Sequence, residues 1–72
     1  MLDQIELLDV VALTTDHPEK GLVRGQVGTV VETLAPNVHE VEFSDDAGRT
    51  YALAAFSDEE LMPLYYRPQR AA

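Results

Sequence analysis

Both histidines of the chain stand beside carboxylates, a combination that binds transition metals or transfers protons. His17 is followed by Glu19, and His39 is followed by Glu40. Imidazole and carboxylate groups suit zinc and related ions, but these spacings match no established ligand motif. We interpret His17 as a solvated turn residue and His39 as a residue at a strand edge. The sequence therefore predicts no metal site.

Other side chains that take part in catalysis are present without the surroundings that catalysis needs. Asp45 and Asp46 are adjacent, so their carboxylates diverge in a turn, whereas two catalytic carboxylates face one substrate at a defined separation. Ser44 and Ser57 do not lie in a nucleophile elbow. We predict that the protein is not an enzyme and has no catalytic residues.

The spaced glycines of the first half do not form a phosphate-binding loop. Gly21, Gly25 and Gly28 are not followed by the start of a helix, and Lys20 precedes the series instead of ending it. A role in backbone conformation explains them, and we predict no cofactor.

The charge balance opposes binding to nucleic acids and anionic membranes. Thirteen acidic residues against five basic ones give a formal net charge of -8, and the pI is near 4.3. A phosphate backbone would be repelled over most of such a surface. We expect neither a nucleic-acid partner nor a membrane partner. The five cations are Lys20, Arg24, Arg49, Arg67 and Arg70.

The same acidity favours a partner protein with a basic surface. Glu40 and Glu42 alternate with apolar residues, so both side chains fall on one solvent face of a strand. Acidic surfaces speed encounter with basic partners and reject anionic ones. Exposed tyrosines can anchor an interface. The predicted partner-binding residues are Glu40, Glu42, Asp45, Asp46, Tyr65 and Tyr66.

Length and composition predict one small globular domain. The chain has 72 residues, of which 46% are hydrophobic, and no cysteine, so a disulfide framework is excluded. We expect a single domain over residues 1–66 and a flexible tail over residues 67–72. The segment Met1–Leu8 has no basic residue and no long apolar run, which predicts a cytoplasmic protein.

Hydrophobic patterning predicts five strands and no long helix. The segment from Arg49 to Phe56 is apolar on both faces, so it is expected to be a central strand. Gly28 within a strand indicates a bulge or a close backbone approach. The expected strands are Val10–Thr14, Val27–Leu34, Val38–Ser44, Arg49–Phe56 and a last one from Leu61, Met62, Leu64 and Tyr65.

The connections complete the predicted architecture. Residues 16–26 are expected to form a long ordered loop that Leu22 and Val23 pin to the core. The Asp45–Gly48 segment is typical of a hairpin turn, and Ser57 with Glu60 is typical of the start of a short 3₁₀ turn. The predicted fold is an all-β, five-stranded, small SH3-like barrel with one short 3₁₀ turn before the last strand. An oligonucleotide-binding barrel is less suitable because no segment supplies its helix.

One set of spaced residues runs through most of the chain: Asp9 to Thr14, Asp16, Pro18-Glu19, Gly21-Leu22, Gly25, Val27 to Val31, Val41 to Phe43, Gly48 and Leu61. The combined spacing of this set resembles a bacterial family, domain of unknown function 4926. The match runs from about Leu8 to Leu64, and its most specific part is Gly25 to Val30. The resemblance implies an SH3-like barrel and no reaction.

We therefore expect a non-enzymatic, acidic interaction module. One interpretation is an antitoxin or immunity-type partner of a basic protein. The alternative is an accessory or regulatory subunit of a larger enzyme complex, because the fold is similar to small barrels that serve as accessory chains of ferredoxin–thioredoxin reductase and photosystem I. A homodimer is a further alternative that the sequence leaves open.

Overall fold

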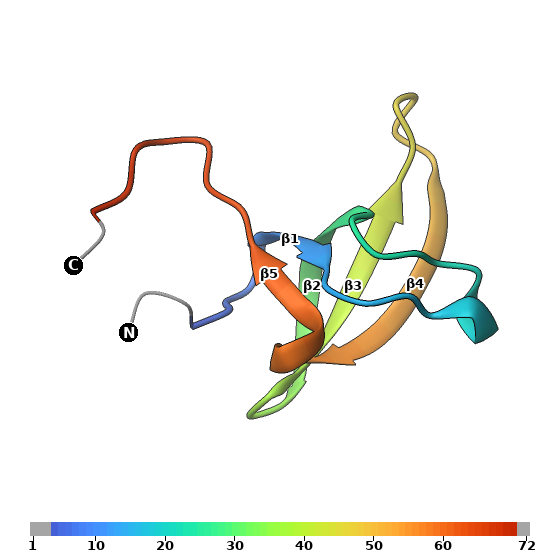
Figure 1. Ribbon diagram of the computed structural model, residues 1–72, viewed down its shortest axis with the longest axis horizontal. Coiled ribbons are helices and arrows are strands. Elements are labelled where there is room, and N and C mark those ends of the chain that lie inside the picture. The colour runs from blue at the N-terminus through green and yellow to red at the C-terminus, as the bar shows by residue number, and fades with distance from the viewer. Residues whose placement is uncertain (1–3, 71–72) are drawn as a thin grey trace.

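The structure, a computed structural model, describes residues 4–70, and its secondary structure is dominated by β-strands (Figure 1). The predicted domain covers residues 1–66, of which residues 1–3 lie outside this range, and the predicted tail covers residues 67–72, of which residues 71–72 lie outside it. In chain order the elements are β1 (Val10–Leu13), the 3₁₀ helix η1 (Pro18–Lys20), β2 (Val27–Ala35), β3 (Val38–Ser44), β4 (Thr50–Ser57), the 3₁₀ helix η2 (Asp58–Glu60) and β5 (Leu61–Pro63).

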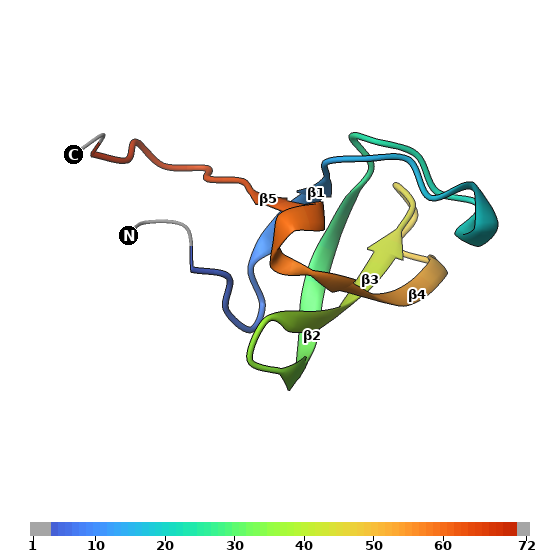
Figure 2. The same ribbon diagram turned by 60° about the horizontal axis from the view of Figure 1, so that its bottom comes forward.

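The five strands form one antiparallel sheet in the order β4-β3-β2-β1-β5. The predicted all-β class, the five strands and the 3₁₀ turn before the last strand are confirmed. The sheet is strongly curved, as Figure 2 shows, but it is not closed into a barrel: no ladder joins β4 to β5 among residues 4–70. Within residues 4–70, no helix has the length and apolar character needed to cross a membrane.

The prediction that β4 is a central strand is wrong, because β4 is an edge of the sheet. Its inner side chains Ala52 and Ala54 pack against the core, and Phe56 is buried. On the other face Leu53 is 56% exposed. The second apolar face of this strand therefore meets solvent and not another layer of protein.

The core lies against the concave face of the sheet. In β3, Val41 and Phe43 are fully buried while Glu40 and Glu42 point away, as their alternation predicts. The rings of Phe43 and Phe56 meet edge to face, with centroids 6.0 Å apart and planes at 81°. The other buried apolar side chains are Ile5, Val11, Leu13, Leu22, Val30 and Leu61.

Gly28 in β2 occupies a position where no side chain fits. A Cβ atom there would lie 2.6 Å from Cγ1 of Val41 and 2.8 Å from the carbonyl oxygen of Glu42. The predicted close backbone approach is confirmed, and it lets β2 and β3 pack tightly against the core.

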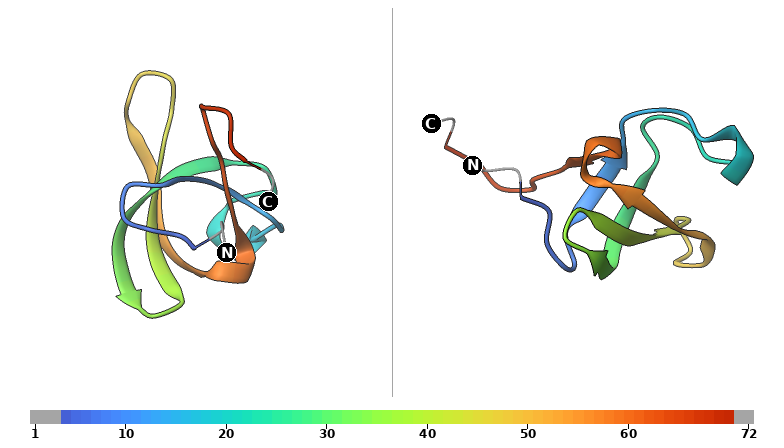
Figure 3. Two further views of the ribbon diagram at one scale, coloured as in Figure 1. Left: turned by 90° about the vertical axis from the view of Figure 1, so that its left-hand side faces the viewer. Right: turned by 90° about the horizontal axis from the view of Figure 1, so that it is seen from below.

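The loop over residues 14–26 folds back onto the core and contains the short helix η1, which the sequence did not predict. Leu22 is 1% exposed and anchors the loop as expected, whereas Val23 is 55% exposed and does not. His17 and Leu22 exchange two backbone hydrogen bonds, of 2.9 and 3.1 Å. Figure 3 shows the loop extending away from both termini.

The end of the chain follows the predicted capping pattern as far as β5. The Glu60 carboxylate accepts hydrogen bonds from the backbone N–H of Ser57 at 2.8 Å and from its hydroxyl at 3.2 Å, which supports η2. The last strand is shorter than predicted, because it ends at Pro63, so Tyr65 lies beyond it. Residues 67–70 have no regular secondary structure, and the flexibility of the tail stays a prediction.

Candidate functional site: an acidic face on the outer side of the sheet

The outer face of β2, β3 and β4 carries two of the predicted site residues, Glu40 and Glu42. Strand pairing places Glu40 opposite Ala55 of β4 and Glu42 opposite Leu53. Both carboxylates point away from the core, because their neighbours His39, Val41 and Phe43 are buried. The two predicted residues therefore share one surface, as expected.

A third carboxylate on this surface was missed by the sequence interpretation. The β2–β3 ladder has a bulge between Val30 and Glu32, and past it Glu32 lies directly opposite Glu40. A regular alternation from Val30 would have paired Val31 with Glu40. We call the outward side chains of Glu32, Glu40 and Glu42 the acidic face.

Nothing within the three strands neutralises the acidic face. The residues of β2, β3 and β4 include these three glutamates and neither lysine nor arginine. The Thr50 hydroxyl donates a hydrogen bond to Oε2 of Glu42, which orients that carboxylate without changing its charge. Like charges directly opposite each other in a sheet are destabilising. The face therefore has an unmet preference for cations.

Asp45 and Asp46 lie in the β3–β4 turn, and Asp45 serves the turn itself. Its Oδ1 accepts hydrogen bonds from the backbone N–H groups of Ala47 and Arg49, each at 2.9 Å. Its Oδ2 lies 3.5 Å from Nε of Arg49. Asp45 is therefore occupied by turn contacts, while Asp46 is exposed beside it.

Tyr65 and Tyr66 lie at the other end of the sheet from β4. They follow β5, the opposite edge strand, and Figure 1 shows this segment leaving on the side of the molecule away from β4. Tyr66 is 89% exposed. Both tyrosines line a shallow hollow of about 310 Å³ with residues of the β1 segment, among them Leu8 and Asp9. The predicted site is therefore two separate surfaces.

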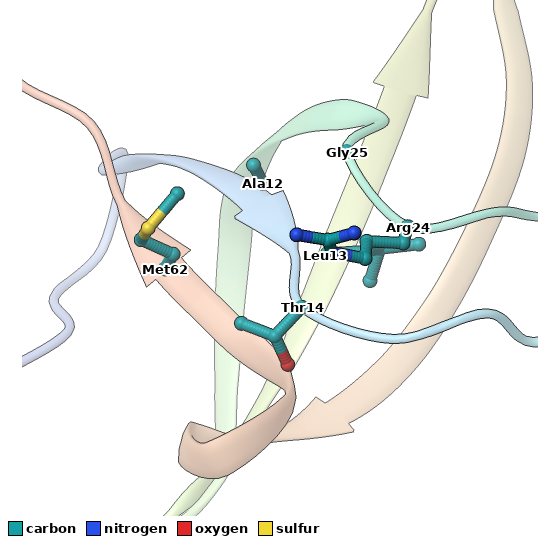
Figure 4. Close-up of a pocket in the computed structure, with 6 residues that line it drawn as sticks. All are labelled: Ala12, Leu13, Thr14, Arg24, Gly25 and Met62. Carbon is teal, nitrogen blue, oxygen red and sulfur yellow. The ribbon is translucent and has the colours of Figure 1, made fainter.

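A second hollow, of about 490 Å³, opens beside β1 and β5 (Figure 4). Strand pairing puts Val27, Ala12 and Met62 in one row, and Met62 is 52% exposed. The guanidinium of Arg24 reaches over this hollow, as the sticks in Figure 4 show. The lining is otherwise mostly apolar, and no motif in the sequence pointed to it. The lining residues are Ala12, Leu13, Thr14, Arg24, Gly25 and Met62.

His39 is buried, contrary to its interpretation as a residue at a strand edge. The imidazole is 2% exposed, with Nε2 at 2.6 Å from Oδ1 of Asp58 and Nδ1 at 3.3 Å from Oγ1 of Thr33. Because the carboxylate only accepts, Nε2 carries a proton and donates it to Asp58. This array contains a hydroxyl, an imidazole and a carboxylate, but it is satisfied internally. It links the β2–β3 hairpin to η2.

His17 is also buried, at 8% exposure, and not a solvated turn residue. Its ring meets Phe56 edge to face with centroids 4.8 Å apart, and its nitrogens lie 3.7 Å from Glu19 and 3.6 Å from Glu60. The pKa of Glu19 is lowered by a hydrogen bond from the backbone of Glu19 itself, with Lys20 and His17 contributing.

Among residues 4–70, no group of three or more His, Cys, Asp or Glu side chains is placed to hold a metal ion.

Comparison with known proteins identifies a family but no characterised relative. No curated protein matches the chain, and no solved structure matches it. A family model described as a domain of unknown function, DUF4926, matches residues 7–63. These residues include all five strands and the acidic face. Because the match spans most of the chain, the protein belongs to the family of domain of unknown function 4926.

Proposed function

We propose that the chain is a non-enzymatic interaction module whose acidic face binds a basic surface of a partner protein. The observation that carries this proposal is the cross-strand pair of Glu32 and Glu40, with Glu42 two residues along β3 on the same face, on strands that contain neither lysine nor arginine. Cations of a partner would reduce the repulsion between these carboxylates, and this reduction favours the complex over the free protein.

The physical setting of the acidic face supports recognition by charge. The face lies on a protein of net charge -8, so the surrounding field adds to its attraction for a basic surface. Leu53, opposite Glu42 and half-exposed, offers apolar contact area next to the carboxylates. Salt screens such attraction over about 8 Å at physiological ionic strength. The complex should therefore weaken as salt rises.

A non-enzymatic role is supported by the position of the polar groups that resemble catalytic ones. His39 lies beneath the surface, and its two nitrogens are already engaged with Thr33 and Asp58. Neither hollow described above is lined by His39 or His17. A general base needs hydrogen-bond reach to a substrate proton, and neither imidazole has that access.

The class of the partner is the finer part of the proposal. In one form the partner is a basic toxin that this chain neutralises, as an antitoxin or immunity protein does. In the alternative form the chain is an accessory subunit of an enzyme. Expression of the partner alone separates the two: a toxin stops growth, whereas an enzyme core loses activity or stability. We place the complex in the bacterial cytoplasm as part of this proposal.

Charge reversal tests the acidic face directly. Tagged wild-type protein and the variant carrying Glu40→Lys and Glu42→Lys are used to capture proteins from nuclease-treated lysate of the source cells at low and moderate salt. We expect a basic protein to be retained by the wild type at low salt, to be released as salt rises, and to be lost with the variant.

A matched control keeps the net charge the same as that of the variant. Reversing Glu6 and Glu59, which lie outside β2, β3 and β4, should leave capture nearly unchanged. Equal losses with both double variants would mean that only overall charge matters, and retention unaffected by Glu40→Lys with Glu42→Lys would refute the proposal.

A further variant, Tyr66→Ser, tests the separate contact predicted at Tyr65 and Tyr66.

A further inference from the structure

The two edge strands of the sheet differ in how well they are protected against pairing with a strand of another molecule. β5 has three residues and ends in Pro63, which limits pairing with another strand. β4 has eight residues, none of them charged and none of them proline. Natural proteins usually protect a long edge strand with charges, proline or a covering segment. The unprotected edge of β4 is therefore a feature that needs an explanation.

The backbone of β4 pairs on one side only. Every ladder pair of β4 within the described residues is with β3. The loop over residues 14–26 reaches β4 through side chains, with Nε2 of Gln26 at 3.2 Å from the Tyr51 hydroxyl and the His17 ring against Phe56. Neither contact uses the outward backbone groups of β4. Every second N–H and C=O along residues 50–55 is thus placed to pair with an added strand.

The acidic face indicates the chemistry of the strand that fits. Neighbouring strands lie about 4.8 Å apart, so a residue added beside Ala55 would be about 9.6 Å from Glu40 across the ladder. Ala55 is small and exposed, and it leaves space for a long side chain to lie over it toward the carboxylate. A lysine or arginine beside Ala55 would reach Glu40. A second one, two residues along the added strand and beside Leu53, would reach Glu42.

We infer that β4 accepts an extended, basic segment of the partner as a sixth strand. Backbone hydrogen bonds to residues 50–55 provide affinity, and cations at alternate positions of the segment contact the acidic face. This inference rests on the proposed function, because it assigns the binding mode of the same surface. A second copy of the chain is less suitable, since its β4 would bring a second set of acidic residues to a protein of net charge -8.

The test uses three capped octapeptides and the full chain. The first alternates lysine and valine, the second is the same peptide with its four central amides N-methylated, and the third alternates glutamate and valine. N-methylation preserves the charge and removes the backbone donors. Affinity is measured by fluorescence anisotropy at low salt, and amide exchange of the protein is followed by NMR.

We expect the unmodified basic peptide to bind at least about tenfold more tightly than its N-methylated form. Its binding should slow exchange at every second amide of residues 50–55, and Glu40→Gln should weaken it while the matched variant Glu6→Gln should not. The acidic peptide should not bind measurably. These results support strand addition.

Other outcomes overturn the inference and separate it from the proposed function. Equal affinity of the two basic peptides, with loss on Glu40→Gln, would overturn strand addition and leave charge recognition by the acidic face intact. Absence of binding by both basic peptides would overturn both proposals. A protein dimer in sedimentation experiments that protects the β4 amides would assign the edge to a second copy and overturn the basic occupant.

Discussion

Glu32 and Glu40 lie directly opposite each other on the outer face of β2 and β3, with no lysine or arginine on either strand or on β4. Cross-strand neighbours of this kind have their Cβ atoms about 5 Å apart, so the two carboxylates repel each other. This arrangement costs stability in the free protein, and it concentrates negative charge where a partner can approach.

The first prediction concerns this repulsion. Replacing Glu32 with Gln should raise the free energy of unfolding by about 0.2–1 kcal/mol, because an unfavourable like-charge pair is removed. Urea denaturation at low salt measures the change. The gain should shrink at about 1 M salt, where the screening length is about 3 Å.

The matched control for this prediction is Glu6→Gln, since Glu6 is exposed and lies outside the strands. It removes the same charge without touching the Glu32–Glu40 pair. A gain of the same size in both variants would attribute the effect to net charge, and a destabilised Glu32→Gln variant would contradict the expected repulsion.

The second prediction concerns the hydrogen bond between His39 and Asp58. Asp58→Ala should lower the free energy of unfolding by about 1–3 kcal/mol, because Nε2 of the buried His39 ring loses its acceptor. Chemical denaturation followed by circular dichroism provides the measurement. Asp58→Asn retains an acceptor oxygen and should cost less.

Glu59→Ala provides the control within the same 3₁₀ helix, since Glu59 is exposed and the polar partners of the His39 ring are Thr33 and Asp58. This change is expected to stay within about 0.5 kcal/mol of the wild type. If Asp58→Ala and Glu59→Ala were equally mild, the link between η2 and the β2–β3 hairpin would contribute little to stability.

The third prediction concerns the contact between Gly28 and Val41. Gly28→Ala should destabilise the protein by about 1–3 kcal/mol, because the new Cβ would lie 2.6 Å from Cγ1 of Val41 and close to the backbone of Glu42. Thermal or urea unfolding measures the loss, and methyl NMR should show a shifted Val41 signal.

Gly48→Ala separates this clash from ordinary glycine strain. Gly48 has φ +81° in the β3–β4 turn, and a Cβ there would meet no atom within 4 Å. Its alanine variant should lose stability through backbone strain alone, without disturbing the core methyl signals. An undisturbed Val41 signal in Gly28→Ala would show that the sheet relaxes around the extra carbon.

Local features of this protein could be predicted from sequence because each depends on nearby residues. The alternation around Val41 and Phe43 set the inward and outward faces of β3, since side chains in a strand point to opposite sides in turn. Asp45 and Gly48 produced the expected turn, and Ser57 with Glu60 produced the expected start of η2. The acidic character of the β3 surface follows from the same alternation.

The remaining features required the tertiary structure because they depend on which strands become neighbours. Only the sheet order made β4 an edge and separated Tyr66 from Glu40. A bulge in β2 brought Glu32 opposite Glu40, and the local sequence pattern did not indicate this bulge. His17 and His39 are buried because distant partners, Glu60 and Asp58, lie beside them. Sequence alone determined the presence of the five strands and of η2 and the charges that they carry, and long-range pairing decided which of these charges share a surface.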